Sequence, residues 1–223
     1  ADGDSVETNN LLRQHFISSD ISKNKAAVLA ERYAAAFGIQ IGVITHNIEK
    51  VEDFEFFKNE SKTTNKSDLV IGCVDNVPSR KLINEWFNGS CIGNCDGFTW
   101  RGHFWIDAGN EEKAGQVVCG YNPPSRGSYL AKKIKVDTDT EVSGEFSMPS
   151  VFEIYPNLLN TEGKFNSELS CAERAISAPQ NMQTNVTAST IIMNFVQKII
   201  NGTPIKSHAV DFSIDNVFAT RLN

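Results

Sequence analysis

Apolar residues in the first third of the chain switch between a helical spacing and short continuous runs. Residues 22–37 are rich in Ala, Leu and Glu, with Ser22 placed to cap a helix and Gly38 placed to end it. An apolar, β-branched run follows at 39–45, and a second run at 68–74 indicates a strand buried on both faces. This alternation of helix and strand predicts an α/β fold around a mostly parallel sheet.

The middle of the chain continues the same alternation. Pro78 is placed to open a helix and Gly89 to close it. Two apolar segments, 104–107 and 115–120, predict further strands. The acidic, Phe-rich segment 51–57 has the pattern of an amphipathic packing element.

The last third contains one long amphipathic helix. It spans about 181–200, carries an apolar stripe and is followed by Gly202 as a stop. The tail 207–218 alternates like an edge strand. Between about 121 and 171 the pattern weakens, which predicts an irregular insertion or crossover region. Because no repeat or low-complexity linker divides the chain, we expect a single domain over 1–223.

Composition and charge narrow the function classes. With 223 residues, 40% hydrophobic and 22% charged, the chain is neither collagen, nor coiled coil, nor wholly disordered. The 21 basic and 27 acidic residues give a net charge of −6, so no global field attracts nucleic acid or an anionic membrane. No apolar run approaches the roughly 20 residues of a membrane span, and the amino terminus is acidic rather than a basic leader. We therefore expect a cytoplasmic protein.

The five cysteines predict reduced thiols rather than a disulfide framework, because their number is odd and their spacing loose. Cys91 and Cys95 form a single loose pair with no second pair to complete a zinc site, so no zinc is expected. Cys73 and Cys119 lie in apolar strand candidates, which predicts core packing for both.

Candidate chemistry begins at the amino terminus. Asp2 and Asp4 are acidic, and an acidic residue at the carboxyl end of a strand can bind ribose hydroxyls. Arg13, Gln14 and Lys25 carry groups that can neutralise a triphosphate. Taken singly, the two aspartates could form a turn, the arginine a surface ion pair, and the lysine simply a helix start.

A second candidate follows the apolar run 68–74. Asp75 and Asn76 come directly after this run. Ligands of open α/β sheets gather outside the carboxyl ends of the strands, so this position favours a binding role for Asp75.

Together these motifs resemble the adenylating family of ThiF, MoeB and the ubiquitin-activating enzymes. The family signatures D-x-D-x-V-x-x-x-N-L-x-R-Q and T-D-N or V-D-N have counterparts at 2–14 and 74–76. Between them, the K-x-x-K-A helix start has a counterpart one residue shorter, Lys-Asn-Lys-Ala at 23–26. A closer similarity is to the ThiF-like proteins of bacterial plasmid PRTRC gene clusters. It rests on the segments WIDAGN at 105–110, GQVV at 115–118, PSVFEIYP at 149–156 and SCAE at 170–173, and on Asn185 in the last helix.

The resemblance implies roles for the residues of the first motifs. Asp2 would bind the ribose. Asn10, Arg13 and Gln14 would contact the phosphates. Lys25 would stabilise the charge that develops on the α-phosphate and the pyrophosphate.

It also implies roles further along the chain. Asp75 would hold Mg²⁺, and Arg80 would contact phosphate or the incoming carboxylate. Some relatives use a cysteine before the penultimate helix to accept the activated carbonyl or sulfur, and Cys171 lies in a comparable context. A thiolate at a helix start would gain from the helix dipole, while the alternative for Cys171 is an inert loop cysteine.

The fold and activity implied are those of an ATP-dependent adenylyltransferase with an open, mostly parallel, Rossmann-like sheet and flanking helices. It would activate the carboxyl terminus of a small ubiquitin-like or sulfur-carrier protein, using ATP and Mg²⁺, as a homodimer. The alternative is a catalytically inactive scaffold or adaptor that keeps the fold and the partner surface. A generic NAD-dependent oxidoreductase is disfavoured, because hydride transfer has no use for the motifs around Asn10 and Asp75.

One family feature is absent from the sequence. Members begin with a strand, a Gly-x-Gly-Gly-x-Gly loop and a helix, whereas Ala1 falls near the end of what would be the second strand. The chain could be proteolysed or recorded incompletely, the piece could come from another polypeptide, or the protein could be truncated and inactive. We expect the first.

Overall fold

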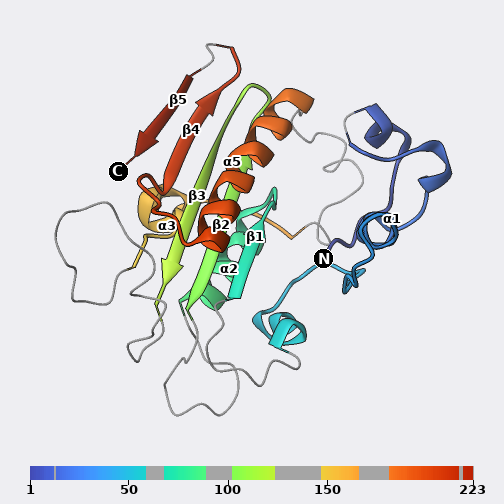
Figure 1. The fold of residues 1–223 in the computed structure, drawn as a ribbon, viewed down its shortest axis with the longest axis horizontal. Coiled ribbons are helices and arrows are strands. Elements are labelled where there is room, and N and C mark those ends of the chain that lie inside the picture. Colours follow the sequence, from blue (N-terminus) through green and yellow to red (C-terminus); the bar gives the residue numbers. More distant parts are fainter. Residues whose placement is uncertain are drawn as a thin grey trace.

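A five-stranded sheet is the centre of the computed structural model, which describes residues 1–12, 14–58, 68–88, 102–123, 147–165, 181–215 and 218–222. The strands, in spatial order, are β1 (Asp68–Gly72), β2 (His103–Asn110), β3 (Ala114–Asn122), β4 (Ala209–Ser213) and β5 (Phe218–Leu222). Figure 1 shows the sheet open, with helices against it. This confirms the Rossmann-like α/β fold class.

The pairing within the sheet is mixed. β1 and β2 are parallel, with Gly72 opposite Asp107, whereas β2–β3, β3–β4 and β4–β5 are antiparallel. Of the described strand pairs, β1–β2 has the parallel pairing that was predicted for most of the sheet, and the others do not. The reason lies in the connections, because only three residues join β2 to β3 and so short a link cannot cross over to a parallel strand.

Four α-helices and four 3₁₀ helices accompany the sheet. The α-helices are α1 (Lys25–Phe37), α2 (Val77–Phe87), α3 (Val151–Ile154) and α5 (Met182–Asn201). The 3₁₀ helices are η1 (Thr8–Leu12), η2 (Ser18–Asp20), η3 (Val51–Lys58) and η4 (Pro156–Asn160). These counts refer to the described part of the chain. None of these helices has both the length and the apolar character that a membrane crossing requires.

The helix α5 covers one face of β2 and β3 (Figure 1). Ile192 and Phe195 of this helix share a buried cluster with Ile106 of β2 and Val117 of β3. Its first turn is also tied to the β2–β3 turn, since the Thr184 hydroxyl donates a hydrogen bond of 2.8 Å to the Glu112 carbonyl. The predicted helix is thus confirmed, with Asn181 as its cap and Gly202 as its stop at φ +61°.

The other face of the same strands is covered by α2, α3 and η3. Trp105 of β2 lies here, next in sequence to Ile106, because side chains alternate between the faces of a strand. Ile83 and Trp86 of α2 pack against it in one cluster, together with Val51 and Phe54 of η3. The amphipathic packing element predicted at 51–57 is therefore confirmed for Val51 and Phe54.

The amino-terminal segment has a small core of its own. Val6, Phe16 and Val28 are buried together, and Val28 comes from α1. In Figure 1 this segment and α1 lie beyond β1, on the side of the sheet away from β5.

Two local predictions in this segment are corrected. Ser22 does not cap α1: it has φ +69°, and the Asn24 side chain instead accepts the Ala27 N–H at 3.0 Å. The run 39–45 is not a strand, because β-branched residues form one only where an edge is available for pairing. Its backbone bonds include one from the Asp2 N–H to the Ile44 carbonyl and one from the Ile39 N–H to the Ala34 carbonyl of α1.

Two further predictions change along the sheet. The tail does not end in a lone edge strand, since β4 pairs with β3 on one side and β5 on the other. Cys73 is exposed rather than packed in the core, because the apolar run continues past the end of β1, whereas Cys119 in β3 is buried as predicted.

Candidate functional site

The predicted ribose and phosphate residues near the amino terminus form a compact turn against the start of α1. Lys25, the first residue of α1, pairs through Nζ with Asp4 Oδ2 at 3.0 Å. Asn24 Nδ2 donates to the carbonyls of Asp2 and Asp4 at 2.8 and 3.2 Å. One Asp2 carboxylate oxygen accepts the Asp4 N–H at 2.8 Å. The helix start thus brings Asp2, Asp4 and Lys25 together.

The ammonium of Lys25 keeps donors beyond the one that Asp4 accepts, because a lysine ammonium carries three. The structure therefore places a cation beside the Asp2–Asp4 turn while leaving it able to bind an anion. Gly3 lies inside this turn, where its N–H donates to Asn47 Oδ1 at 3.1 Å. A Cβ at Gly3 would collide with the Asn47 side chain, so the turn requires glycine here. The sequence analysis did not single out Asn47.

Asn10 and Gln14 lie in and just after η1. Asn10 is buried, and its side chain accepts the Glu7 N–H at 2.8 Å, which shapes the turn that η1 follows. The Gln14 side-chain oxygen is buried with no hydrogen-bond partner among the described residues. Arg13 and Cys171 lie outside the described residues, so their roles stay predictions.

Asp75 lies at the carboxyl end of β1, as the sequence predicts. Its side chain is exposed, and Asn76 Nδ2 donates to Asp75 Oδ1 at 3.3 Å. Asn76 also caps α2, because its own oxygen accepts the Ser79 N–H at 2.8 Å. The carboxylate is thus held next to the amino-terminal end of a helix, where the macrodipole favours negative charge.

Arg80 lies on the first turns of α2 and is buried against β2. Its Nε donates to both carboxylate oxygens of Asp107, at 3.2 and 3.1 Å, and its terminal nitrogen donates to the Ala108 carbonyl at 3.3 Å. Arg80 is 8% exposed and Asp107 1%. The structure therefore pairs Arg80 with a carboxylate of the protein, while its predicted contact with phosphate or substrate carboxylate stays a prediction.

Asp107 is the charged residue that sequence reasoning missed. Burial raises the pKa of its carboxyl to about 6, against the attraction of the Arg80 guanidinium, which lowers it. The available signal was a lone acidic residue within an otherwise apolar strand, where a buried charge needs a partner. The sequence did not say which cation, 27 positions away, would supply that partner.

The donor set can be tested for Mg²⁺. Among the described residues no three His, Cys, Asp or Glu side chains gather as a metal-binding group. Mg²⁺ at nucleotide sites needs only one or two carboxylates, with phosphate oxygens and water completing the shell. Asp75 is exposed and could supply one carboxylate, whereas Asp107 is buried and occupied by Arg80. The residues present therefore fit the ion when a nucleotide shares it.

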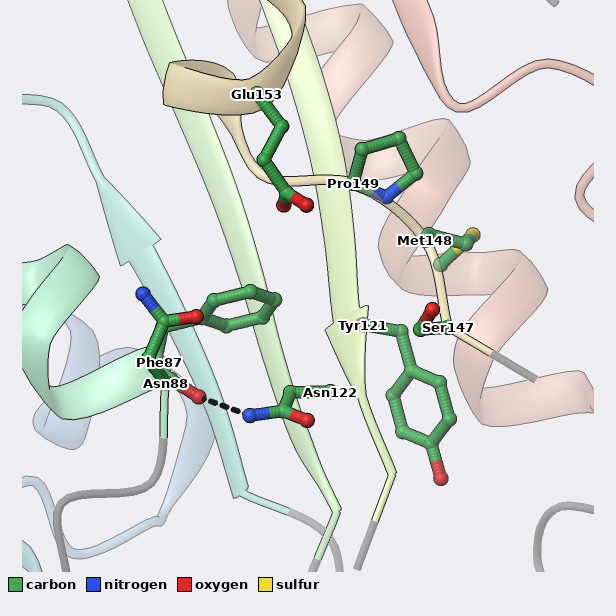
Figure 2. A pocket seen from close by; sticks show the side chains of 8 residues that line it. All are labelled: Phe87, Asn88, Tyr121, Asn122, Ser147, Met148, Pro149 and Glu153. Atoms are coloured by element: carbon green, nitrogen blue, oxygen red, sulfur yellow. Dashed lines mark hydrogen bonds between the residues drawn. The ribbon is translucent and has the colours of Figure 1, made fainter. Parts of the chain in front are cut away.

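A separate cavity of about 210 Å³ lies at the opposite end of the sheet (Figure 2). It opens beside Asn122, which pairs with His103 at the start of β2, whereas Asp75 follows the end of β1. The Asn122 side chain donates to the Phe87 carbonyl at 2.7 Å, as the dashed line in Figure 2 shows. The cavity is therefore distinct from the predicted nucleotide residues.

Known proteins share this fold and parts of the sequence. The ubiquitin-like modifier-activating enzyme 5 of Dictyostelium discoideum is 29% identical over 119 residues, which are 51% of this chain and 28% of that protein. Crystal structures of Escherichia coli MccB with ATP and of the microcin C7 biosynthetic enzyme MccB in complex with N-formylated MccA are each 20% identical, with TM-scores of 0.55. The structure of PaaA is 14% identical, with a TM-score of 0.58.

The matched structures cover all of this chain, which in turn covers 54%, 56% and 62% of theirs. The chain thus spans little more than half the length of these structural neighbours. At this level of identity they show the shared fold. The ThiF family itself matches residues 1–218, nearly the whole sequence, and the chain therefore belongs to the ThiF family.

Proposed function

We propose that this chain is the adenylation domain of an ATP-dependent adenylyltransferase, which activates the terminal carboxylate of a small ubiquitin-like or sulfur-carrier protein. The observation that carries the proposal is the ThiF family match over 1–218, combined with an exposed Asp75 at the carboxyl end of β1. A structural neighbour, MccB, has been crystallised with ATP, which supports a nucleotide as the ligand.

The turn beside α1 supports the roles proposed for the residues at the amino terminus. Asp2 would bind the ribose, and Lys25 would bind the phosphates with the donors that Asp4 leaves available. Arg13, Asn10 and Gln14 would complete the phosphate contacts. The Gln14 side-chain oxygen is buried without a partner among the described residues and is an acceptor, so a phosphate contact of Gln14 would be made by its amide nitrogen. The Asn10 side-chain oxygen already accepts the Glu7 N–H.

The chemistry proposed is nucleotidyl transfer. A carboxylate oxygen of the carrier attacks the α-phosphorus of ATP, a new O–P bond forms, and the bond to the β-phosphate oxygen breaks to release pyrophosphate. The protein contributes position and positive charge rather than a covalent intermediate in this step. When bound, Mg²⁺ would be held by Asp75 and would neutralise phosphate charge.

The partner proposed is a small folded protein with an extended carboxyl terminus. The curated relative is named for activating a ubiquitin-like modifier, and MccB has been crystallised with N-formylated MccA, so both names support a polypeptide substrate. We also propose a homodimer, as in the family. Onward transfer of the activated group to Cys171 is a further part of the proposal.

The test is the exchange of labelled pyrophosphate into ATP by the full-length protein. In the presence of its carrier protein, the wild type should catalyse the exchange and Asp75→Ala should reduce it by roughly 100-fold or more, because phosphate charge is then unbalanced. The measurement is radioactivity recovered in ATP over time.

The matched control is Cys171→Ala, which should retain exchange and lose only a covalent thioester or persulfide. Loss of exchange in Cys171→Ala, with the fold intact by circular dichroism, would contradict a role for that thiol after adenylation. A wild-type protein that binds the carrier but neither binds nor turns over ATP would instead be an inactive scaffold.

A further inference from the structure

A buried ion pair joins the start of α2 to β2, in the helix that follows the Asp75–Asn76 turn. Arg80 reaches from α2 to Asp107 in the middle of the sheet, and its Nε lies within 3.2 Å of both carboxylate oxygens. A third bond, from the Arg80 terminal nitrogen to the Ala108 carbonyl, fixes the plane of the guanidinium. These bonds determine where the beginning of α2 lies relative to the sheet.

Two glycines lie against the pair, although the tightest contacts of a Cβ would be with Trp105 at Gly72 and with Gln116 at Gly109. A Cβ at Gly72, opposite Asp107 in β1, would lie 3.4 Å from an Asp107 oxygen and 3.0 Å from the Trp105 ring nitrogen. A Cβ at Gly109 would lie 3.2 Å from the Arg80 terminal nitrogen. The neighbouring strand β1 at Gly72, and β2 itself two residues beyond Asp107, therefore pass close to the pair without side chains of their own at these positions.

Stability alone does not account for such a pair. Apolar residues of similar volume are often as stable as a buried ion pair or more so, because both charges must lose their water. One benefit that apolar packing lacks is direction, since the planar guanidinium donates through Nε to the Asp107 carboxylate and through a terminal nitrogen to the Ala108 carbonyl, and the two acceptors together fix its orientation. The fixed orientation of Arg80 should therefore position a part of the structure that lies close to the pair.

The adjacent feature is the Asp75–Asn76 turn. The backbone N–H of Arg80 donates to the backbone carbonyl of Asn76 at 3.4 Å, within the first turn of α2. The Asn76 side chain caps that helix through Ser79 and donates to the Asp75 carboxylate. A continuous series of contacts thus runs from Asp107 through Arg80 and Asn76 to Asp75.

We propose that Arg80 and Asp107 are a positioning pair that orients Asp75, so that Arg80 acts through Asp107 and the helix start rather than by contact with phosphate. This inference rests on the proposed function. It revises the role that family resemblance implies for Arg80, and it assigns Asp107 to the same reaction although its carboxylate is buried.

The experiment measures pyrophosphate exchange by the full-length protein, with its carrier protein at a fixed saturating concentration, as a function of ATP and Mg²⁺ concentration. The variants are Asp107→Asn, Arg80→Lys and the double variant Arg80→Met with Asp107→Leu. We expect Asp107→Asn to lower kcat by roughly 10- to 100-fold and to raise the Mg²⁺ concentration needed for half-maximal rate, with little change in the KM for ATP.

The double variant separates positioning from folding. Its apolar pair should keep the protein folded, with a melting temperature near that of the wild type, while kcat remains as low as in Asp107→Asn. Arg80→Lys keeps the charge but loses the planar guanidinium that donates to both the Asp107 carboxylate and the Ala108 carbonyl, so the variant should retain less than half of the wild-type kcat.

Two results would overturn the proposal. One is wild-type kcat and Mg²⁺ dependence in a folded Asp107→Asn or double variant. The other is a large rise in the KM for ATP in Arg80→Lys that Asp107→Asn does not share, since this would indicate direct phosphate contact. If the wild type itself shows no exchange, the proposed function fails and this inference fails with it, a result distinct from the first two.

Discussion

The pKa of Asp107 in the candidate site is shifted away from its ordinary value. Its carboxyl is 1% exposed and its pKa is raised to about 6 by burial, although Arg80 lies 3.1 Å away. In the unfolded chain an aspartate titrates near 3.9. Between these two values the folded protein holds a proton that the unfolded chain has already released.

The pH dependence of stability follows from this difference. Because the folded state binds the proton more tightly, the contribution of Asp107 to the free energy of unfolding is greatest below about pH 4. As the pH rises from about 4 through about 6, this contribution is lost, and the free energy of unfolding falls by up to roughly 3 kcal/mol. Urea unfolding of the wild type and of Asp107→Asn from pH 4 to 8 measures it.

The quantity to compare is the wild-type free energy of unfolding minus that of the variant. It should fall as pH rises and level off above about pH 7. A difference that stays flat, or that grows with pH, would show that the ion pair with Arg80 outweighs burial and that the carboxyl keeps a normal or lowered pKa.

The site roles of individual residues could be proposed from the sequence where a local pattern fixes their position in the fold. Asp75 follows an apolar run, and Lys25 lies where a helix begins, so both could be proposed from the sequence. Asp107 and Asn47 could not, because each acts on a residue brought close only by the tertiary fold: Arg80 for one and Gly3 for the other.

At the scale of the element, the start of α1 depends on one side chain. Asn24 accepts the Ala27 N–H and donates to the carbonyls of Asp2 and Asp4, so it caps the helix and holds the acidic turn. Asn24→Ala should lower the free energy of unfolding by about 1–2 kcal/mol, the upper part of the range of about 0.5–2 kcal/mol for a lost cap, because the two bonds to the Asp2 and Asp4 carbonyls are lost as well. Chemical denaturation of the two proteins measures it.

Ser22 is the matched control for this prediction. It carries the residue type of a cap but has φ +69° and makes no cap bond to α1. Ser22→Ala should therefore leave stability within about 0.5 kcal/mol of the wild type. A larger loss in Ser22→Ala than in Asn24→Ala would contradict the assignment of the cap.

Whole elements were predictable where local signals and burial agree. Gly38 follows the end of α1 and Gly202 follows the end of α5, and both have a positive φ. Glycine adopts this conformation without the steric cost of a Cβ, which is why it marks both helix ends in the sequence. The run 39–45 has strand composition but no strand, and Ile39 and Ile41 are exposed. Composition alone does not provide the neighbouring edge that a strand needs.

For the whole molecule, α5 provides the cover for one face of the sheet. Phe195 is 2% exposed within the cluster that includes Ile106 and Val117, whereas Met193, two positions earlier, is 53% exposed. Phe195→Ala should cost about 3–5 kcal/mol of unfolding free energy, through lost burial and the cavity that remains. Met193→Ala should cost no more than about 0.5 kcal/mol.

Thermal or urea unfolding, read by far-UV circular dichroism, measures both variants. Equal losses in the two would mean that α5 does not lie on the sheet in solution as the structure describes.

The overall α/β class was predictable, because helical and strand patterns alternate along the first half of the chain. The mixed pairing was not, since it depends on the three-residue link between β2 and β3.

The small core around Val6, Phe16 and Val28 is separate from the two clusters on β2 and β3, so we expect the amino-terminal segment to open as a unit of its own. Three buried side chains resist local opening less than the two clusters on β2 and β3 do, so this unit opens at a lower free-energy cost than global unfolding. A nucleotide bound by Asp2 and Lys25 would add its binding free energy to this least stable unit. Ligand occupancy would thus be coupled to the order of the segment that binds it.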